Sequence, residues 1–162
     1  MPHNSPAGRT NKDTTVAERR SGTKDTIAKL VAERTEMLAL FCRLAGLESF
    51  QGSRQHKPTQ DLLQEFCQVL VDYIAAGHFS LYERIVNGTE RRREIAALAE
   101  GLYPRISATT QIALDFNDKY DSGQLFEIGP AFQNELSRLG EELAARIEYE
   151  DQIINALLTP RG

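Results

Sequence analysis

Residues 130–158 read PAFQNELSRLGEELAARIEYEDQIINALL, and this stretch decides the fold class. Its large apolar residues recur every three to four positions, which is the spacing that places side chains on one face of an α-helix. They are Phe132, Leu136, Leu139, Leu143, Ile147, Ile154, Leu157 and Leu158. Gly129 and Pro130 mark the start, because proline suits the first turn of a helix. We therefore predict a final amphipathic helix of roughly seven turns.

Two earlier segments carry the same pattern. Residues 25–45 have apolar side chains at helical spacing, and Gly46 follows as a stop signal. In residues 59–76, Thr59 suits the N-cap position and Gly77 suits a C-terminal cap. The apolar arc of this second helix is roughly 200° wide, which is more than a bundle helix requires. Either the connecting segments or a partner helix would cover the excess. The arc contains Leu62, Leu63, Phe66, Cys67, Val69, Leu70, Val71, Tyr73 and Ile74.

The segment between residues 78 and 121 predicts short helices followed by a long one. Residues 78–86 fit a short helix, and Thr89 can cap another that ends before Pro104. Pro104 then suits the first turn of a third long helix, which Ser122 and Gly123 end. No strand pattern or repeat is visible. We predict an all-α fold, an antiparallel four-helix bundle with short connecting helices between the second and third long helices.

Charge is distributed unevenly along the 162 residues. Residues 1–24 hold five of the 19 Lys and Arg residues but two of the 23 acids, which leaves a net charge of −7 on the remainder. Residues 1–23 lack apolar periodicity, so we predict a flexible basic tail there and a single bundle domain at 24–162. An acidic bundle suits a basic protein partner and not nucleic acid, whose phosphates require cations.

Composition excludes several other classes. No apolar run approaches the roughly 18 residues of a membrane span, and no secretory signal is visible. Cys42 and Cys67 stand singly in apolar stretches, which indicates a reducing cytoplasm. The chain has three histidines, without the paired His and Glu spacing of metal-binding bundles. We therefore expect no metal, no cofactor and no enzymatic activity, because the acidic cluster near Glu150 has no nucleophile to assist.

Two charged residues fall inside apolar arcs. Helical wheels place Arg34 in the middle of the first arc and Glu150 in the middle of the last. In an up-and-down bundle, both residues lie at the same end of the core, and His78 lies at that end too. The pair is interpreted either as a buried structural ion pair or as part of a polar pocket open to a partner. An acidic stripe of Asp61, Glu65, Gln68 and Asp72 follows the outer face of the second helix. Alone, such a stripe is usually a solvated face.

One run of sequence is distinctive. Residues 63–85 read LQEFCQVLVDYIAAGHFSLYERI, and the core VDYIAAGHFSLYE resembles the Rsd/AlgQ family of bacterial anti-sigma factors. Similar agreement is found in AERTEML at 32–38, LYPRI at 102–106, ALDFND at 113–118 and RIEYEDQII at 146–154, so the resemblance covers residues 27–158. Leu30 stands where the family usually carries Trp, and Tyr149 where it tends to carry an aliphatic residue.

The resemblance implies a function. Family members are helical bundles that bind the C-terminal, promoter-contacting region of the primary sigma factor and reduce its use by RNA polymerase. The resemblance implies that Asp72 is an acidic contact and Phe79 an apolar anchor for the partner. Alternatively, Phe79 belongs to the hydrophobic core. The resemblance also implies that His78, Ser80, Tyr82 and Glu83 surround this anchor. We further expect Asp61 and Glu65 to contribute through the acidic stripe, and Arg34, Glu150 and Asp151 to line the adjoining polar end.

We therefore expect a cytoplasmic anti-sigma factor that is a monomer when free. Two other functions remain as alternatives. A protein-interaction module could regulate another enzyme through the same bundle surface. A hemerythrin-like metal carrier is disfavoured by the small number of histidines.

Overall fold

In a computed structural model, the backbone is described at residues 7–46, 56–82, 85, 93–121 and 130–159, and the side chains at these positions except 7–21 and 56–59. Four α-helices make up most of these residues: α1 (Ala7–Ala45), α2 (His56–Gly77), α4 (Arg93–Tyr120) and α5 (Pro130–Leu158). A π-helical turn, η2 (His78–Tyr82), follows α2 directly. The described residues include no strand, which confirms the all-α class.

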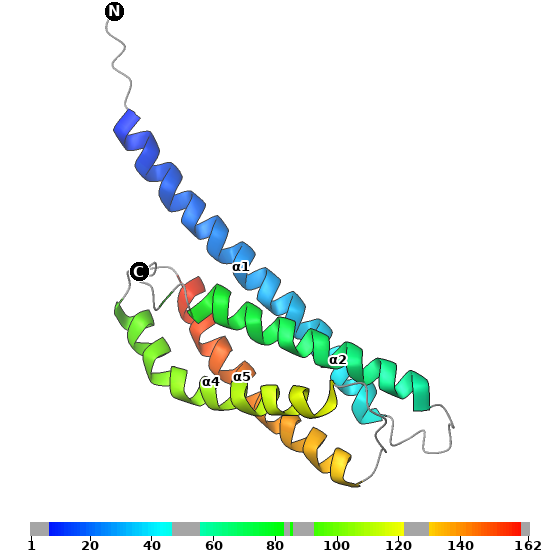
Figure 1. Ribbon diagram of the computed structural model, residues 1–162. Coiled ribbons are helices and arrows are strands. Elements are labelled where there is room, and N and C mark those ends of the chain that lie inside the picture. Colours follow the sequence, from blue (N-terminus) through cyan, green and yellow to red (C-terminus); the bar gives the residue numbers. More distant parts are fainter. Residues whose placement is uncertain (1–6, 47–55, 83–84, 86–92, 122–129, 160–162) are drawn as a thin grey trace, which may run out of the picture.

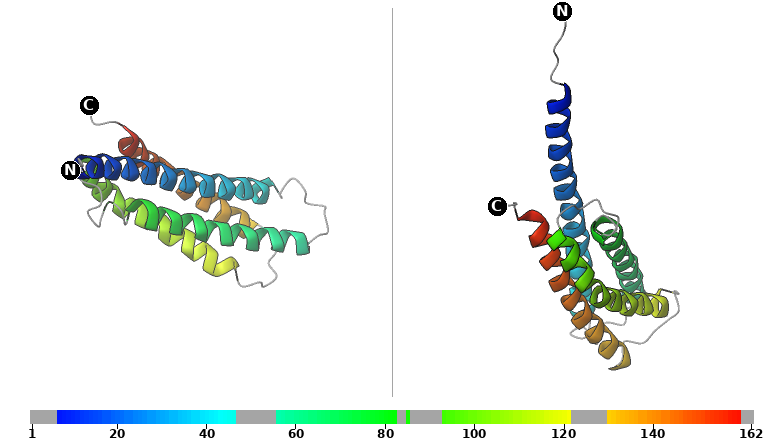
Figure 2. Two further views of the ribbon diagram at one scale, coloured as in Figure 1. Left: turned by 90° about the horizontal axis from the view of Figure 1, so that it is seen from above. Right: turned by 90° about the vertical axis from the view of Figure 1, so that its left-hand side faces the viewer.

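The four helices pack side by side as a bundle. Successive helices run in opposite directions, and the backbone of α1 extends past the end of the others (Figures 1 and 2). The most extensive contacts join α1 to α2 and α4 to α5. Among the described residues, no helix combines the length and the apolar character that crossing a membrane requires.

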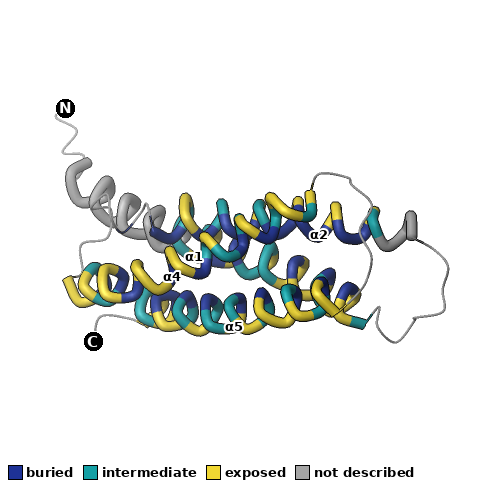
Figure 3. Tube along the Cα trace, turned by 60° about the horizontal axis from the view of Figure 1, so that its bottom comes forward, coloured by how far each residue is buried: buried dark blue, intermediate teal, exposed yellow. Residues whose placement is uncertain are grey.

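Each helix contributes one apolar stripe to a shared core. Buried and exposed positions alternate along every helix at helical spacing (Figure 3). On α5 the buried apolar residues are Phe132, Leu136, Leu139, Leu143, Ile153 and Ile154. The predicted stripe on this helix is thus confirmed over most of its length, but Leu158 at its end is 47% exposed. Ile147 and Leu157 are half-buried.

A close helix contact brings α1 and α5 together at Gly140. A Cβ atom at this position would lie 2.6 Å from Cζ of Phe41. The glycine therefore provides the space that the Phe41 ring fills. The centroid of that ring lies 6.1 Å from the ring centroid of Phe66, which lies 6.0 Å from the ring centroid of Phe116. Aromatic side chains of α1, α2 and α4 thus form a chain of ring contacts that starts at the α5 backbone.

Most helix ends agree with the sequence patterns, but the start of α1 does not. The helix begins at Ala7 and includes residues 7–23, where we predicted a flexible tail. Extending an existing helix adds a hydrogen bond for each residue fixed, so it requires no apolar stripe of its own. The first helix was therefore predicted to begin too late, and the domain boundary at residue 23 stays a prediction. Residues 1–6 lie outside the described part.

The prediction that Pro104 begins a helix was wrong. Pro104 lies inside α4, and the predicted second connecting helix is the first part of that same helix. Buried positions continue through the proline without a change of spacing, at Ile95, Ala99, Leu102, Ile106, Thr109, Ala113 and Phe116. Pro104 itself is exposed. Packing of this stripe outweighs the one backbone hydrogen bond that the proline removes. Asn87, Gly88 and Thr89 lie outside the described residues.

The wide apolar arc of α2 is covered within the bundle. Eight of its nine residues are buried, and Val71 is half-buried. Helices α1 and α4 and the π-helical turn all contact α2. This is the first of the two alternatives, so the excess width does not form a groove for a partner helix. The helix begins at His56, slightly before the predicted cap at Thr59.

Candidate partner-binding surface and buried ion pair

Arg146 and Glu150 form a buried ion pair inside the bundle. Their side chains are 1% and 0% exposed. The residues lie one turn apart on α5, and Arg146 Nε donates a hydrogen bond of 3.2 Å to Glu150 Oε2. Both follow Leu139 and Leu143 at helical spacing, so the apolar stripe of α5 directs them into the core. Removing charge from water is costly, and such a pair requires further hydrogen bonds.

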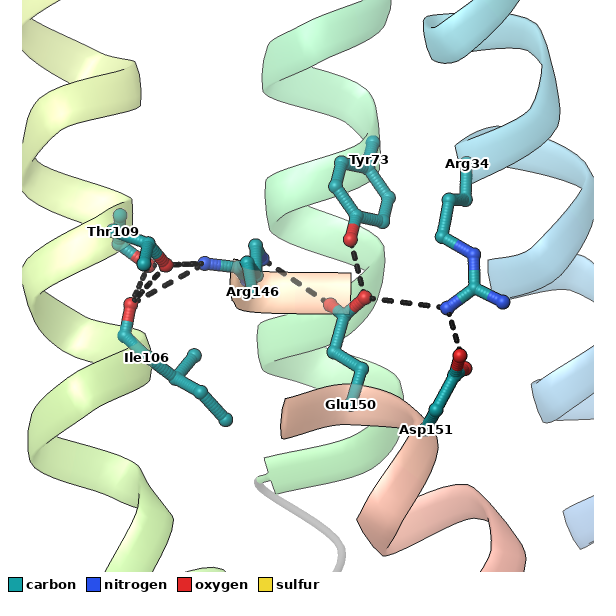
Figure 4. Close-up of polar contacts among 8 residues, drawn as sticks. Arg34, Tyr73, Ile106, Thr109, Arg146, Glu150 and Asp151 are labelled. Atoms are coloured by element: carbon teal, nitrogen blue, oxygen red, sulfur yellow. Dashed lines mark hydrogen bonds and ion pairs between the residues drawn. The ribbon is translucent and has the colours of Figure 1, made fainter. Parts of the chain in front are cut away.

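Helix α4 provides hydrogen-bond acceptors for Arg146. Its Nη1 donates to Thr110 Oγ1 at 2.7 Å and to Thr109 Oγ1 at 3.2 Å. The backbone carbonyl of Ile106 lies 3.4 Å from the same nitrogen. Thr109 is 3% exposed, which is unusual for threonine and is explained by its bonds to Arg146 and to the Ile106 carbonyl. The guanidinium thus bridges α5 and α4 (Figure 4).

Glu150 is held from the other side by α2 and α1. The hydroxyl of Tyr73 donates a hydrogen bond to Oε1. Arg34 Nη1 lies 3.7 Å from this oxygen and 2.9 Å from Oδ1 of Asp151. The predicted Arg34–Glu150 pair is therefore confirmed, but Arg34 is closer to Asp151, whose side chain is 46% exposed. The contacts run from the α1–α5 surface through the core to α4 (Figure 4).

The environment changes the acidity of the buried groups. Burial raises the pKa of Glu150, while Arg146, the hydrogen bond from Tyr73 and the charge of Arg34 act in the opposite direction. The pKa of Tyr73 is raised by burial and by the negative charge of Glu150. Because Glu150 is inaccessible, a partner cannot contact it directly, and the structural interpretation of the pair is the one that the burial supports. The prediction of Glu150 as a contact residue was wrong.

The backbone of α2 packs directly on this pair at Gly77. A Cβ atom there would lie 3.2 Å from Arg146 Nη2 and 3.2 Å from Glu150 Oε2. We predicted that Gly77 would end the helix as a cap. The α-helix does end at Gly77, where the chain continues into the π-helical turn His78–Tyr82, and the glycine also allows α2 to approach the charges. The short helix predicted from His78 is present in this form over five residues.

The acidic stripe of α2 lies on the surface. Asp61, Glu65, Gln68 and Asp72 are all exposed. Gln68 Nε2 donates a hydrogen bond to Asp72 Oδ1 at 3.2 Å, which places these two side chains on one face. The stripe leaves its carboxylates available to solvent or to a basic partner. Their role in binding stays a prediction.

The π-helical turn separates the residues that the resemblance grouped around Phe79. The Phe79 ring is 64% exposed, so its alternative as a core residue was wrong. His78 is also exposed and its ring lies 5.0 Å from that of Phe79, while Ser80 is half-buried. Tyr82 was predicted to surround Phe79, but it is 2% exposed and contacts Tyr103, so it is buried in the core while Phe79 is exposed. Glu83 lies outside the described residues.

Two central residues escaped the sequence analysis. Arg146 lies three positions after Leu143 and four before Glu150, so a helical wheel of α5 places it in the buried arc. Tyr73 was assigned to the apolar arc of α2 without a partner for its hydroxyl. The wheel was therefore sufficient to find Arg146. The partners of both residues depend on the relative positions of different helices, which one sequence does not contain.

Within the described part of the chain, no three His, Cys, Asp or Glu side chains are placed to hold a metal ion. The polar atoms of the pair are instead directed at one another and at Thr109, Thr110 and Tyr73. The buried cluster thus fixes how helices pack, and the exposed groups of α2 and the π-helical turn stay a predicted partner-binding surface.

Comparison with known proteins places this arrangement in a family. The family model described as regulator of RNA polymerase sigma(70) subunit, Rsd/AlgQ, matches residues 10–158. The chain belongs to the Rsd/AlgQ family. A protein named regulator of sigma D from Yersinia enterocolitica is 33% identical over 147 residues, covering 89% of this chain and 87% of its own length. Proteins of the same name from Shigella dysenteriae and from Escherichia coli are 33% identical over 148 residues, covering 88% of this chain and 90% of theirs.

The Rsd/AlgQ match also includes much of the N-terminal segment. It begins at residue 10, within the part of α1 that we treated as a tail, and it ends at the last residue of α5. In this Rsd/AlgQ protein, the residues that match the family model therefore include the ion pair, the acidic stripe, the π-helical turn and most of the predicted tail.

Proposed function

We propose that this member of the Rsd/AlgQ family is an anti-sigma factor. It binds the C-terminal, promoter-contacting region of the primary sigma factor and reduces the use of that factor by RNA polymerase. Family membership supports a regulator of the sigma factor, and relatives at 33% identity carry the name regulator of sigma D. In this proposal the protein acts in the cytoplasm, as a monomer when free, and without catalysing a reaction.

One observation carries the choice of surface. The exposed acidic stripe of α2 leads toward the exposed ring of Phe79, which follows Asp72 by seven positions. Phe79 lies in the π-helical turn that follows α2 directly, so an acidic region and an exposed apolar group lie on consecutive elements. A protein segment that holds DNA phosphates is basic, and it matches such a stripe in charge. Phe79 adds an apolar contact that partners favour at the centre of an interface.

In this proposal, the protein reduces use of the sigma factor by covering the surface with which that factor contacts promoter DNA. A sigma region held against the acidic stripe of Asp61, Glu65 and Asp72 has its cations engaged, and the promoter then competes for the same groups. Opposite charges at an interface mainly increase the association rate and selectivity. Salt screens them, because the Debye length falls from about 10 Å at 0.1 M to about 3 Å at 1 M. Binding through this surface is therefore expected to weaken as salt rises.

The test is a calorimetric titration against the isolated C-terminal region of the primary sigma factor of the same bacterium, at two salt concentrations. We expect saturable binding that weakens with salt. Asp72→Arg reverses one exposed charge of the stripe and should weaken binding by about tenfold, or ~1.4 kcal/mol. Glu141→Arg makes the same change at an exposed position of α5 and is the matched control.

Each result has a defined meaning. Loss of affinity in Asp72→Arg with retention in Glu141→Arg supports the α2 surface. Equal affinities of both variants and the unchanged protein would remove Asp72 from the interface. Absence of binding at both salt concentrations would reject the sigma factor region as the partner, and would favour the alternative of a module that regulates another enzyme.

A further inference from the structure

The π-helical turn begins next to the buried ion pair and ends at a buried tyrosine. At its start, Gly77 leaves space for Arg146 and Glu150 directly against the backbone, as its 3.2 Å Cβ distances to both side chains show. At its end, Tyr82 is buried, and its ring centroid lies 6.0 Å from that of Tyr103. Five residues thus connect a glycine packed on the ion pair to a tyrosine held in the core.

A π-helical turn is uncommon and requires support from its surroundings. Its geometry is less favourable than that of an α-helix, and it occurs mostly as single turns, often at functional sites. Here the support comes from packing: Leu81 and Tyr82 are each 2% exposed, and the turn contacts α1 as well as α2. Phe79, between these anchored ends, is 64% exposed. The conformation of the turn therefore determines where the Phe79 ring is presented.

The hydroxyl of Tyr82 shows that packing holds the end of the turn. Among the described side chains it is one of two buried polar groups that lack a hydrogen-bond partner. Burial and the negative charge of Glu150 raise the pKa of this hydroxyl, while Arg146 acts in the opposite direction. An unpartnered buried hydroxyl costs free energy, so its position is imposed by the packing of the turn and not by its own bonding.

We propose that Arg146 and Glu150 are positioning residues for the partner-binding surface. They pack against the backbone at Gly77, where the π-helical turn begins, and so they control the presentation of Phe79 without touching the partner. The identity of the partner rests on the proposed function, whereas the effect on Phe79 does not. The ion pair is therefore linked to binding through one backbone segment, in addition to its contribution to stability.

The test separates positioning from stability. Gly77→Ala places a methyl group against the ion pair, and Glu150→Gln removes the charge while keeping the size of the side chain. Gly140→Ala is the control, because its methyl group would meet Phe41 at 2.6 Å in a different part of the bundle. All proteins are labelled with 4-fluorophenylalanine, and the fluorine resonance of Phe79 is assigned by comparison with Phe79→Leu. Melting temperature and affinity for the sigma factor fragment are measured on each.

We expect Gly77→Ala and Glu150→Gln to shift or split the Phe79 resonance and to weaken fragment binding by about tenfold. Gly140→Ala should lower the melting temperature but leave the Phe79 resonance and the affinity unchanged. The proposal is overturned if the Phe79 resonance stays in place in both test variants, or if their affinity falls no further than that of Gly140→Ala. Glu150→Gln alone decides the question if Gly77→Ala does not fold.

Failure of the proposed function gives a different pattern. If the unchanged protein does not bind the fragment, the sigma factor region is not the partner. The Phe79 resonance in Gly77→Ala and Glu150→Gln still shows whether the ion pair positions the turn.

Discussion

Arg146 and Glu150 hold each other across one turn of α5, with Nε 3.2 Å from Oε2, and neither side chain is accessible to solvent. Their remaining contacts come from the other three helices. Arg146 binds Thr109 and Thr110 of α4, and Glu150 accepts from Tyr73 of α2 and lies near Arg34 of α1. This pair is therefore the point at which all four helices meet through polar groups.

Loss of Arg146 should cost far more stability than loss of Arg34. Arg146→Met leaves Glu150 buried without its nearest cation, and breaking such a pair costs about 3–5 kcal/mol. Arg34→Met leaves the Arg146 and Tyr73 bonds in place, and its main partner Asp151 is partly solvated, so a loss of about 1 kcal/mol or less is expected. Unfolding in urea gives both free energies. Equal losses would contradict the central role of Arg146.

The same chemical change at two tyrosines should have opposite effects. Tyr73→Phe removes a donor from buried Glu150 and should lower the free energy of unfolding by about 1–3 kcal/mol. Tyr82→Phe removes a buried hydroxyl that has no partner among the described residues, so stability should stay the same or rise by up to about 1 kcal/mol. Thermal and urea unfolding of the two variants measure this contrast. A clear loss in Tyr82→Phe would show that its hydroxyl has a partner in solution.

Gly140 and Phe41 should be energetically coupled. Gly140→Ala inserts a methyl group 2.6 Å from the Phe41 ring and is expected to cost about 1–3 kcal/mol by overpacking. Phe41→Leu removes the part of the ring that the methyl group would meet. The double variant should therefore lose less stability than the two single losses added together. Strict additivity in this cycle would place the strain elsewhere.

The two cysteines should differ in reactivity. Cys42 is exposed, whereas Cys67 is 1% exposed and burial raises its pKa to about 12. Because the thiolate is the reactive form, a thiol reagent at pH 8 should modify Cys42 rapidly in the folded protein and Cys67 only after unfolding. Mass spectrometry counts the added groups. Cys42→Ser should abolish the rapid reaction, and rapid labelling in that variant would mean that the core opens near Cys67.

Apolar spacing was sufficient to predict the helical bundle, since buried stripes such as Leu136 to Leu143 depend on local sequence alone. It failed at Pro104, because the local signal for a helix start was outweighed by packing of Leu102 and Ile106 on both sides. It also failed at the start of α1, where helix extension needs no apolar residues. These errors share one cause: local preferences are weak compared with contacts or with an existing helix.

The candidate site was predictable in part for a related reason. Helical wheels identified the exposed stripe with Asp72 and the polar positions Arg34 and Glu150, because burial follows the face of a helix. They did not identify the π-helical turn, whose five residues are too few to show a period. Tyr82 was placed beside Phe79 because both belong to one motif, yet Phe79 is exposed and Tyr82 is buried.

The meeting of four helices at one ion pair also has a consequence for how the protein folds. A partly folded form without α4 would leave Arg146 short of its threonine partners, and one without α2 would leave Glu150 without Tyr73. Such forms either bury an unsatisfied charge or admit water to the core, so they lie well above the native state in free energy. The bundle should therefore melt in a single cooperative step, with calorimetric and van't Hoff enthalpies that agree.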